Sequence, residues 1–171
     1  TDHVGIARAL ESDSGSGPAV LIGAGGAARA ALYHLKGQDR EGRILNRSRD
    51  RAEALAGEFG VSAQIQSLED ATAFDGASLV INATSLGMSG QPPLEVDLSA
   101  TSENALVFDM VYAPLRTGLL EQAERLGRRT ADGLIMLVGQ ARPAFEQFFG
   151  APAPQHDGVR HGLLAALEQR A

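Results

Sequence analysis

Cysteine is absent from this sequence of 171 residues, and aromatic residues make up only 5% of it. Without cysteine the chain forms no disulfide framework, no thiolate metal site and no cysteine nucleophile. Basic residues are also few, since 15 lysines and arginines against 21 aspartates and glutamates leave a net charge of -6. This balance argues against binding to nucleic acid or to a membrane surface, because both need a basic face. The lack of disulfides is compatible with a reducing compartment, and we expect a cytoplasmic protein.

Long hydrophobic runs are missing as well, and no stretch reaches the roughly 18 apolar residues that span a bilayer. The polar start Thr1-Asp2-His3 lacks the pattern of a signal peptide. Hydrophobic residues nevertheless make up 44% of the chain, which is enough for one sizeable core. We therefore expect one soluble domain that has no membrane partner.

Short apolar runs alternate with segments of helical spacing along the chain. Residues 28–35, 52–59 and 119–126 repeat hydrophobic side chains at helical intervals. This alternation predicts an α/β fold, a Rossmann-like doubly wound parallel sheet with helices on both faces. The expected buried strands are 19–22, 43–45, 79–81 and 106–108.

Changes in composition divide the chain into four parts. A helix is expected over 1–12, and a linker rich in serine and glycine over 13–18. The domain itself is expected over 19–150 and ends in a longer helix, 134–149. A last helix is expected over 155–171, after a breaker that contains two prolines.

A glycine-rich turn follows the first expected strand and opens an alanine-rich helix, in the pattern G-x-G-x-x-A. In this pattern Gly23 permits the tight turn, Gly25 lets the backbone approach a pyrophosphate, and Ala28 allows close packing of helix on strand. Free N–H groups at the helix start can bind phosphates. The alternative is a tight turn without a ligand, but glycines there cost conformational entropy. The turn therefore predicts a dinucleotide site.

The end of the second expected strand indicates which dinucleotide is bound. NAD-binding proteins usually carry an acidic residue about twenty positions after the glycine turn. Here the strand ends instead in Asn46-Arg47-Ser48, followed by Arg49 and Arg51. Arg47 and Arg51 are four residues apart and can share a helix face, whereas Arg49 points elsewhere. Cations and a hydroxyl suit the 2′-phosphate of NADP, although a solvated arginine surface is the alternative.

These features resemble the shikimate dehydrogenase family, and the resemblance extends over nearly the whole chain. The segment 132–141 is the most specific one, because related nucleotide-binding folds share the glycine turn and the Asn-Arg-Ser strand end but not this segment. The resemblance is carried by residues 23–27, 46–48 with Arg51, 82–88, 109–112 with Pro114 and 117–120, and 132–141.

The resemblance implies NADP-dependent, reversible reduction of 3-dehydroshikimate to shikimate by hydride transfer, in the shikimate pathway of aromatic amino-acid biosynthesis. It implies that 1–12 is an inter-domain helix and that 19–150 is the NADP-binding domain. Tyr112 and Gln140 would bind substrate. The alternatives are that Tyr112 only caps a strand at the sheet edge and that Gln140 is an exposed helix residue. Met136 is equally compatible with core packing. The implied cofactor-binding residues are Gly23, Ala24, Gly25, Gly26, Ala27, Asn46, Arg47, Ser48, Arg51, Met110, Gly133 and Met136, and the position after strand 79–81 adds Thr84 and Ser85.

The resemblance further implies that Asp2 is a catalytic and substrate-binding residue that works with a lysine. The only lysine here is Lys36, far along the first helix of the domain. We expect the catalytic lysine to lie in an N-terminal substrate domain that this sequence lacks. Without it, the chain loses an acid–base contribution of about 100- to 10,000-fold. We therefore expect NADP binding without turnover.

Several alternatives stay open from the sequence. The chain could be the NADPH-binding domain of another reductase, such as glutamyl-tRNA reductase, although segment 132–141 argues against this. It could also be a non-catalytic nucleotide-binding module, or part of a relative that uses quinate. Its histidines show no metal-ligand spacing, so no metal is expected. The terminal helices are expected to expose an apolar strip that allows self-association.

Overall fold

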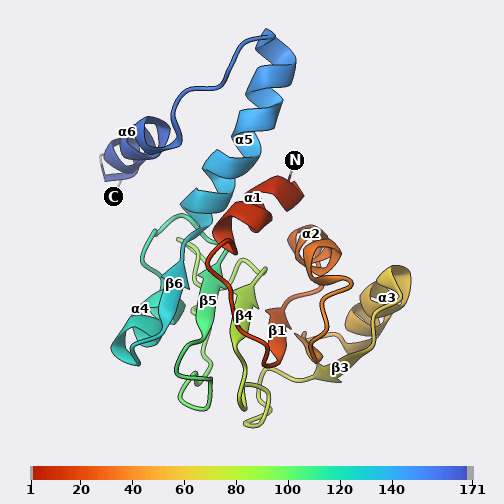
Figure 1. The fold of residues 1–171 in the computed structure, drawn as a ribbon. Coiled ribbons are helices and arrows are strands. Elements are labelled where there is room, and N and C mark those ends of the chain that lie inside the picture. Colours follow the sequence, from red (N-terminus) through yellow and green to blue (C-terminus); the bar gives the residue numbers. More distant parts are fainter. Residues whose placement is uncertain (1, 169–171) are drawn as a thin grey trace.

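In the computed structural model, which describes residues 2–168, six strands form one parallel sheet in the order β3-β2-β1-β4-β5-β6 (Figure 1). The α/β class that the sequence predicts is thereby confirmed. The strands are β1 (Ala19–Ile22), β2 (Gly42–Leu45), β3 (Ala63–Gln66), β4 (Leu79–Asn82), β5 (Leu106–Asp109) and β6 (Arg129–Ala131). The helices are α1 (Asp2–Ala9), α2 (Gly26–Leu35), α3 (Arg49–Phe59), α4 (Gly118–Arg125), α5 (Gly133–Phe149) and α6 (His156–Glu168).

Alternate residues of each central strand enter different cores, because side chains of a strand point to opposite faces of the sheet. In β1, Leu21 packs with residues of α1, α2 and α3, whereas Val20 and Ile22 pack on the other face. That other core contains α4 together with loop residues such as Phe74 and Leu98. Both faces are therefore covered, which explains why the central strands read as continuous apolar runs.

The two outer strands, β3 and β6, have no counterpart among the strands expected from the sequence. Both lie at edges of the sheet, where only one neighbour is present. β3 alternates alanine and isoleucine with glutamine, and β6 has a single buried residue, Ala131. Edge strands need less apolar surface than central ones, so neither segment contains a hydrophobic run.

Helices α1 and α5 cross at very short range. A Cβ on Gly5 would lie 2.4 Å from the carbonyl oxygen of Met136, and a Cβ on Gly139 would lie 3.1 Å from the Cα of Gly5. Glycine at both positions therefore allows the helix backbones to touch. This crossing holds the N-terminal helix against the second half of the fold.

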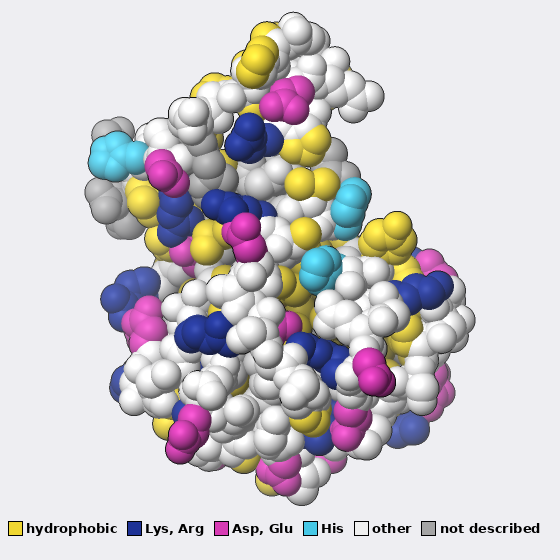
Figure 2. All heavy atoms as spheres, viewed as in Figure 1, with side chains coloured by type: hydrophobic (Ala, Val, Ile, Leu, Met, Phe, Trp, Pro, Cys, Tyr) yellow, Lys and Arg dark blue, Asp and Glu magenta, His cyan; other side chains and the backbone are white. Residues whose placement is uncertain are grey.

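The far end of α5 projects from the body of the molecule, and α6 folds back beside its base (Figure 1). Phe148 and Phe149 are 84% and 69% exposed. Figure 2 shows hydrophobic side chains on this projecting part. The expected self-association stays a prediction, and these residues supply a surface for it. Within residues 2–168, no helix is long and apolar enough to cross a membrane.

Candidate functional site

A cleft of about 880 Å³ opens at the carboxyl ends of β1, β2 and β4. Open parallel sheets bind ligands at the carboxyl ends of their strands, at the point where the strand order reverses. In this sheet that point lies between β1 and β4. Four chain segments meet here: the glycine turn, the residues after β2, the residues after β3 and the loop after β4. The lining residues are Gly23, Ala24, Gly25, Leu45, Asn46, Arg47, Arg51, Ser67, Leu68, Glu69, Ala83, Thr84, Ser85, Leu86, Gln91 and Pro92.

The two glycines Gly23 and Gly25 of the turn differ in their surroundings: the fold requires Gly23, whereas Gly25 borders open space. Gly23 has a φ of 109°, and a Cβ there would lie 2.9 Å from the side chain of Thr84. Gly25, in contrast, has no heavy atom within 4 Å of the position that a Cβ would take. Because protein packing does not demand glycine at position 25, its missing side chain leaves space for a close ligand.

Two helix N-termini at the cleft lack a side-chain cap. No side chain caps the start of α2 after Gly25 or the start of α3 at Ser48. Thr117 caps α4, and Asp132 caps α5 by accepting hydrogen bonds from two backbone N–H groups. Uncapped N–H groups and the helix dipole together favour anions. The cleft therefore offers two anion-binding helix ends.

Arg47 and Arg51 are the cations of the cleft. Among residues 2–168, neither of them pairs with a carboxylate. Arg49, which lies between them in sequence, instead forms an ion pair with Glu53 at 2.7 Å and is exposed. Arg47 and Arg51 thus line the same cleft and Arg49 does not, while their role in binding a phosphate stays a prediction.

A buried network of hydrogen bonds lies at the carboxyl ends of β4 and β5, next to the loops that follow these strands. Asp109, which ends β5, accepts hydrogen bonds from the Asn82 amide at 2.9 Å, the Val111 N–H at 3.0 Å and the Thr117 hydroxyl at 2.6 Å. Asn82 and Asp109 are both 0% exposed and lie opposite one another in β4 and β5. Burial raises the pKa of the Asp109 carboxyl, although these three hydrogen bonds oppose the shift. Asn82, Asp109 and Thr117 belong to segments that carry the family resemblance, which implies no role for them.

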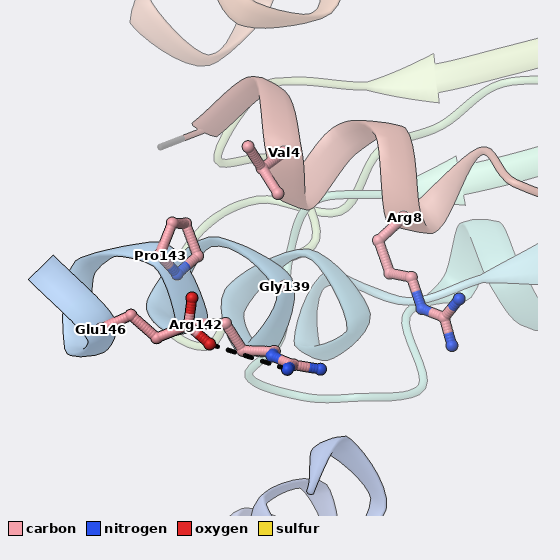
Figure 3. A pocket seen from close by; sticks show the side chains of 6 residues that line it. All are labelled: Val4, Arg8, Gly139, Arg142, Pro143 and Glu146. Carbon is pink, nitrogen blue, oxygen red and sulfur yellow. Dashed lines mark ion pairs between the residues drawn. The ribbon is translucent and has the colours of Figure 1, made fainter. Parts of the chain in front are cut away.

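A second hollow, of about 470 Å³, lies between α1 and α5 (Figure 3). In this view Val4 points from α1 towards α5, and Arg142 pairs with Glu146 along α5. Asp2 begins α1, and Gln140 follows Gly139, which lines the hollow. The helices that carry these two expected substrate residues are thus packed together, at a place separate from the cleft.

The remaining predicted residues lie on α5 and in the segment after β5. A Cβ on Gly133 would lie 2.3 Å from the carbonyl oxygen of Met110, so α5 starts in contact with the end of β5. Met110 and Met136 both pack against the core, which fits the packing alternative for Met136. Tyr112 is 44% exposed. The backbone oxygen of Met136 faces Gly5, so α5 contacts both the end of β5 and α1.

The cleft therefore collects eight of the fourteen predicted cofactor-binding positions, namely Gly23, Ala24, Gly25, Asn46, Arg47, Arg51, Thr84 and Ser85. Gly26 lies in an adjoining hollow that also includes Arg51, while Ala27 continues α2 and Ser48 precedes α3. Sequence reasoning missed Ser67, Leu68 and Glu69 after β3, because it did not predict that strand. Among residues 2–168, no cluster of three or more histidine, aspartate or glutamate side chains could hold a metal ion.

Comparison with known proteins gives one consistent family. A shikimate dehydrogenase (NADP(+)) from Sphingopyxis alaskensis is 47% identical over 97% of this chain and 61% of its own length. A quinate dehydrogenase from Corynebacterium glutamicum, solved with NAD, superposes with a TM-score of 0.84 and 31% identity over 96% of this chain and 62% of its own. A shikimate 5-dehydrogenase from Thermus thermophilus, solved with NADP(H) and shikimate, gives a TM-score of 0.76 and 33% identity over 94% of this chain and 60% of its own.

The chain thus spans about three fifths of the length of these relatives. A sequence model for shikimate / quinate 5-dehydrogenases matches residues 6–109, which include the glycine turn, Arg47, Arg51 and the Asn82–Asp109 pair. From these matches and the geometry of the cleft, the chain belongs to the shikimate / quinate 5-dehydrogenase family.

Proposed function

We propose that this chain forms the NADP-binding part of an enzyme that interconverts 3-dehydroshikimate and shikimate. The observation that carries the proposal is the pair Arg47 and Arg51, two arginines without carboxylate partners among the described residues, in a cleft that the glycine turn also lines. Family membership supports the reaction and leaves little support for a glutamyl-tRNA reductase.

The residues of the cleft fit an extended dinucleotide. The uncapped start of α2 and the open space above Gly25 suit the pyrophosphate. Arg47 and Arg51, with the uncapped start of α3 at Ser48, suit a phosphate on the adenosine ribose. One relative was solved with NAD and another with NADP(H), so the choice depends on this chain's own residues. Two available arginines favour NADP, because an unphosphorylated ribose would leave both charges without a partner.

The substrate side of the proposal rests on α1, α5 and the segment after β5. The Oε1 atom of Gln140 is buried without a hydrogen-bond partner in the described part of the chain. A substrate hydroxyl would satisfy this acceptor. Tyr112 would bind the substrate from the end of β5, and Asp2 would hold or move the proton. NADPH, when bound, supplies the hydride.

Turnover by this chain alone is not expected. Lys36 follows the end of α2 and lines a hollow with Ala19 and Gly42, the first residues of β1 and β2. This hollow lies at the amino ends of the strands, whereas the cleft lies at their carboxyl ends. Lys36 does not line the cleft, and we do not expect it to be the catalytic lysine. The expected substrate domain, the expected domain boundaries and the cytoplasmic location remain predictions.

Calorimetric titration of the chain with NADP and NAD tests the proposal. We expect tighter binding of NADP. Because charge-assisted hydrogen bonds contribute about 1.5–3 kcal/mol each, Arg47→Ala should weaken NADP binding by about ten- to a hundredfold. NAD binding should change little in this variant, since NAD lacks the phosphate.

Arg49→Ala is the matched control, because Arg49 neighbours the same helix start but pairs with Glu53 outside the cleft. It should bind NADP like the wild type. Equal NADP affinity in Arg47→Ala and the wild type would contradict the assigned phosphate site. Failure of the wild-type chain to bind either dinucleotide would contradict the proposed function.

A further inference from the structure

The buried network at Asp109 reaches the wall of the cofactor cleft through one side chain, Asn82. The Asn82 amide nitrogen donates to Asp109 at 2.9 Å and to the carbonyl oxygen of Leu86 at 3.2 Å. Its oxygen accepts from the N–H of Thr84 at 3.0 Å and from the hydroxyl of Thr84 at 2.7 Å. The Thr84 hydroxyl oxygen in turn accepts from the N–H of Leu86 at 3.1 Å. Asn82 thus holds a loop whose residues line the cleft.

An amide side chain can bind in two orientations, with its nitrogen and oxygen exchanged. Asp109 selects one of them for Asn82. An ionised carboxylate only accepts hydrogen bonds, so the group that faces it must be the NH₂ group. The oxygen of Asn82 is then turned towards Thr84, whose N–H and hydroxyl are both donors. The reverse orientation would place NH₂ against the Thr84 N–H.

The same carboxylate also fixes the other side of the network. One oxygen of Asp109 accepts from both Asn82 and the Val111 N–H, and the second accepts from Thr117, which caps α4. Val111 directly precedes Tyr112. No cation among residues 2–168 pairs with Asp109. A buried carboxylate without a cation is unfavourable unless all of its acceptors are satisfied, and here three donors converge on it.

We propose that Asp109 is a positioning residue that sets the amide orientation of Asn82, and so fixes the Thr84 loop of the cofactor cleft and the Val111–Tyr112 segment relative to each other. This inference rests on the proposed function, because it assigns the two segments to cofactor and substrate. The role depends on the acceptor atoms of Asp109 and not on its charge.

Two substitutions at position 109 separate these properties. Asp109→Leu has a similar size but removes both acceptors, whereas Asp109→Asn keeps an oxygen for Asn82 and Val111 and can donate to the oxygen of Thr117. We expect Asp109→Leu to speed amide hydrogen exchange at Thr84 and Val111 and to weaken NADP binding, each by about tenfold or more. Asp109→Asn should retain most of the exchange protection and most of the affinity.

Asn82→Asp gives an independent test if Asp109→Leu does not fold. This isosteric change places two carboxyl oxygens where the 2.9 Å hydrogen bond now lies, so the pair must share a proton. Loss of that proton makes the two groups repel. The NADP affinity of Asn82→Asp, measured relative to the wild type at each pH, should therefore fall as the pH rises.

The results separate the two proposals. A wild-type chain that binds no NADP overturns the proposed function, while the exchange rate at Thr84, which needs no cofactor, still decides whether Asp109 holds the loop. Wild-type exchange and affinity in a folded Asp109→Leu chain would overturn the positioning role. So would equal losses in Asp109→Leu and Asp109→Asn, or an Asn82→Asp chain whose affinity follows the wild type at every pH.

Discussion

The contact between Gly133 and the end of β5 allows a sharp prediction about stability. A Cβ at this position would meet the Met110 carbonyl oxygen at 2.3 Å, the Met110 carbonyl carbon at 2.6 Å and the Val111 carbonyl oxygen at 2.6 Å. These distances are about 1 Å shorter than ordinary van der Waals contacts, which begin near 3.4 Å. All three atoms belong to the backbone, so no side chain can rotate away. In Gly133→Ala, either α5 or the segment after β5 must move.

Overpacking of this kind costs about 1–3 kcal/mol, and the backbone origin of the clash places Gly133→Ala at the upper end of that range. Alanine regains up to about 1 kcal/mol of helix propensity, which leaves a net loss of about 2 kcal/mol. For a chain of this size, Tm should fall by about 4–8 °C. Thermal unfolding followed by circular dichroism measures this change.

Gly57→Ala is the matched control, because Gly57 lies inside α3 with no heavy atom within 4 Å of the position of a Cβ. There the same substitution should stabilise the fold by about 0.5–1 kcal/mol. A Gly133→Ala chain that is as stable as the wild type, or more stable, would refute the argument from backbone contact.

Two further predictions concern the buried and half-buried carboxylates. Burial raises the pKa of Asp109 above its usual 3.8, so the folded chain retains a proton that the unfolded chain releases. The free energy of unfolding should therefore fall as the pH rises from about 3.8 through the raised pKa. Urea titrations at several pH values should show that Asp109→Asn lacks this fall, and parallel pH profiles for both chains would contradict it. Arg160 in α6 contacts both oxygens of Asp132, at 2.9 and 2.6 Å, and Asp132 also caps α5. Arg160→Ala should speed amide exchange in α6 and leave NADP affinity unchanged. Asp132→Ala should lower the free energy of unfolding by about 1 kcal/mol more than Arg160→Ala does, because it also removes the cap of α5. Unaltered exchange in α6 would exclude this ion pair as the contact that holds the helix.

The central part of the fold could be predicted because its strands are buried on both faces. β1 consists entirely of apolar residues and is followed by Gly23. β4 and β5 are apolar except for their last residues, Asn82 and Asp109. β3 and β6 could not be predicted in the same way, because each has only one neighbouring strand and few buried side chains. A hydrophobic pattern in the sequence indicates buried side chains, and edge strands have few buried side chains.

Some parts of the candidate site could be predicted from the sequence and others could not. The glycine turn and Arg47 could be predicted as parts of the site, because local backbone geometry and charge next to a buried strand are enough to recognise them. The relation between Asn82 and Asp109 could not, since it depends on the register between β4 and β5. Glu69 reaches the cleft only because β3 lies beside β2, so a missed strand also concealed a part of the site.

The crossing of α1 and α5 has a consequence for the order in which the chain folds. α1 is synthesised near the start of this chain, but the helix that it touches at Gly139 is made near its end. At about 5–20 residues per second, α1 leaves the ribosome on the order of ten seconds before its partner. Contacts between distant segments also carry the largest loop-closure entropy. The contact between α1 and α5 is therefore expected to form late, after the sheet that carries the cleft.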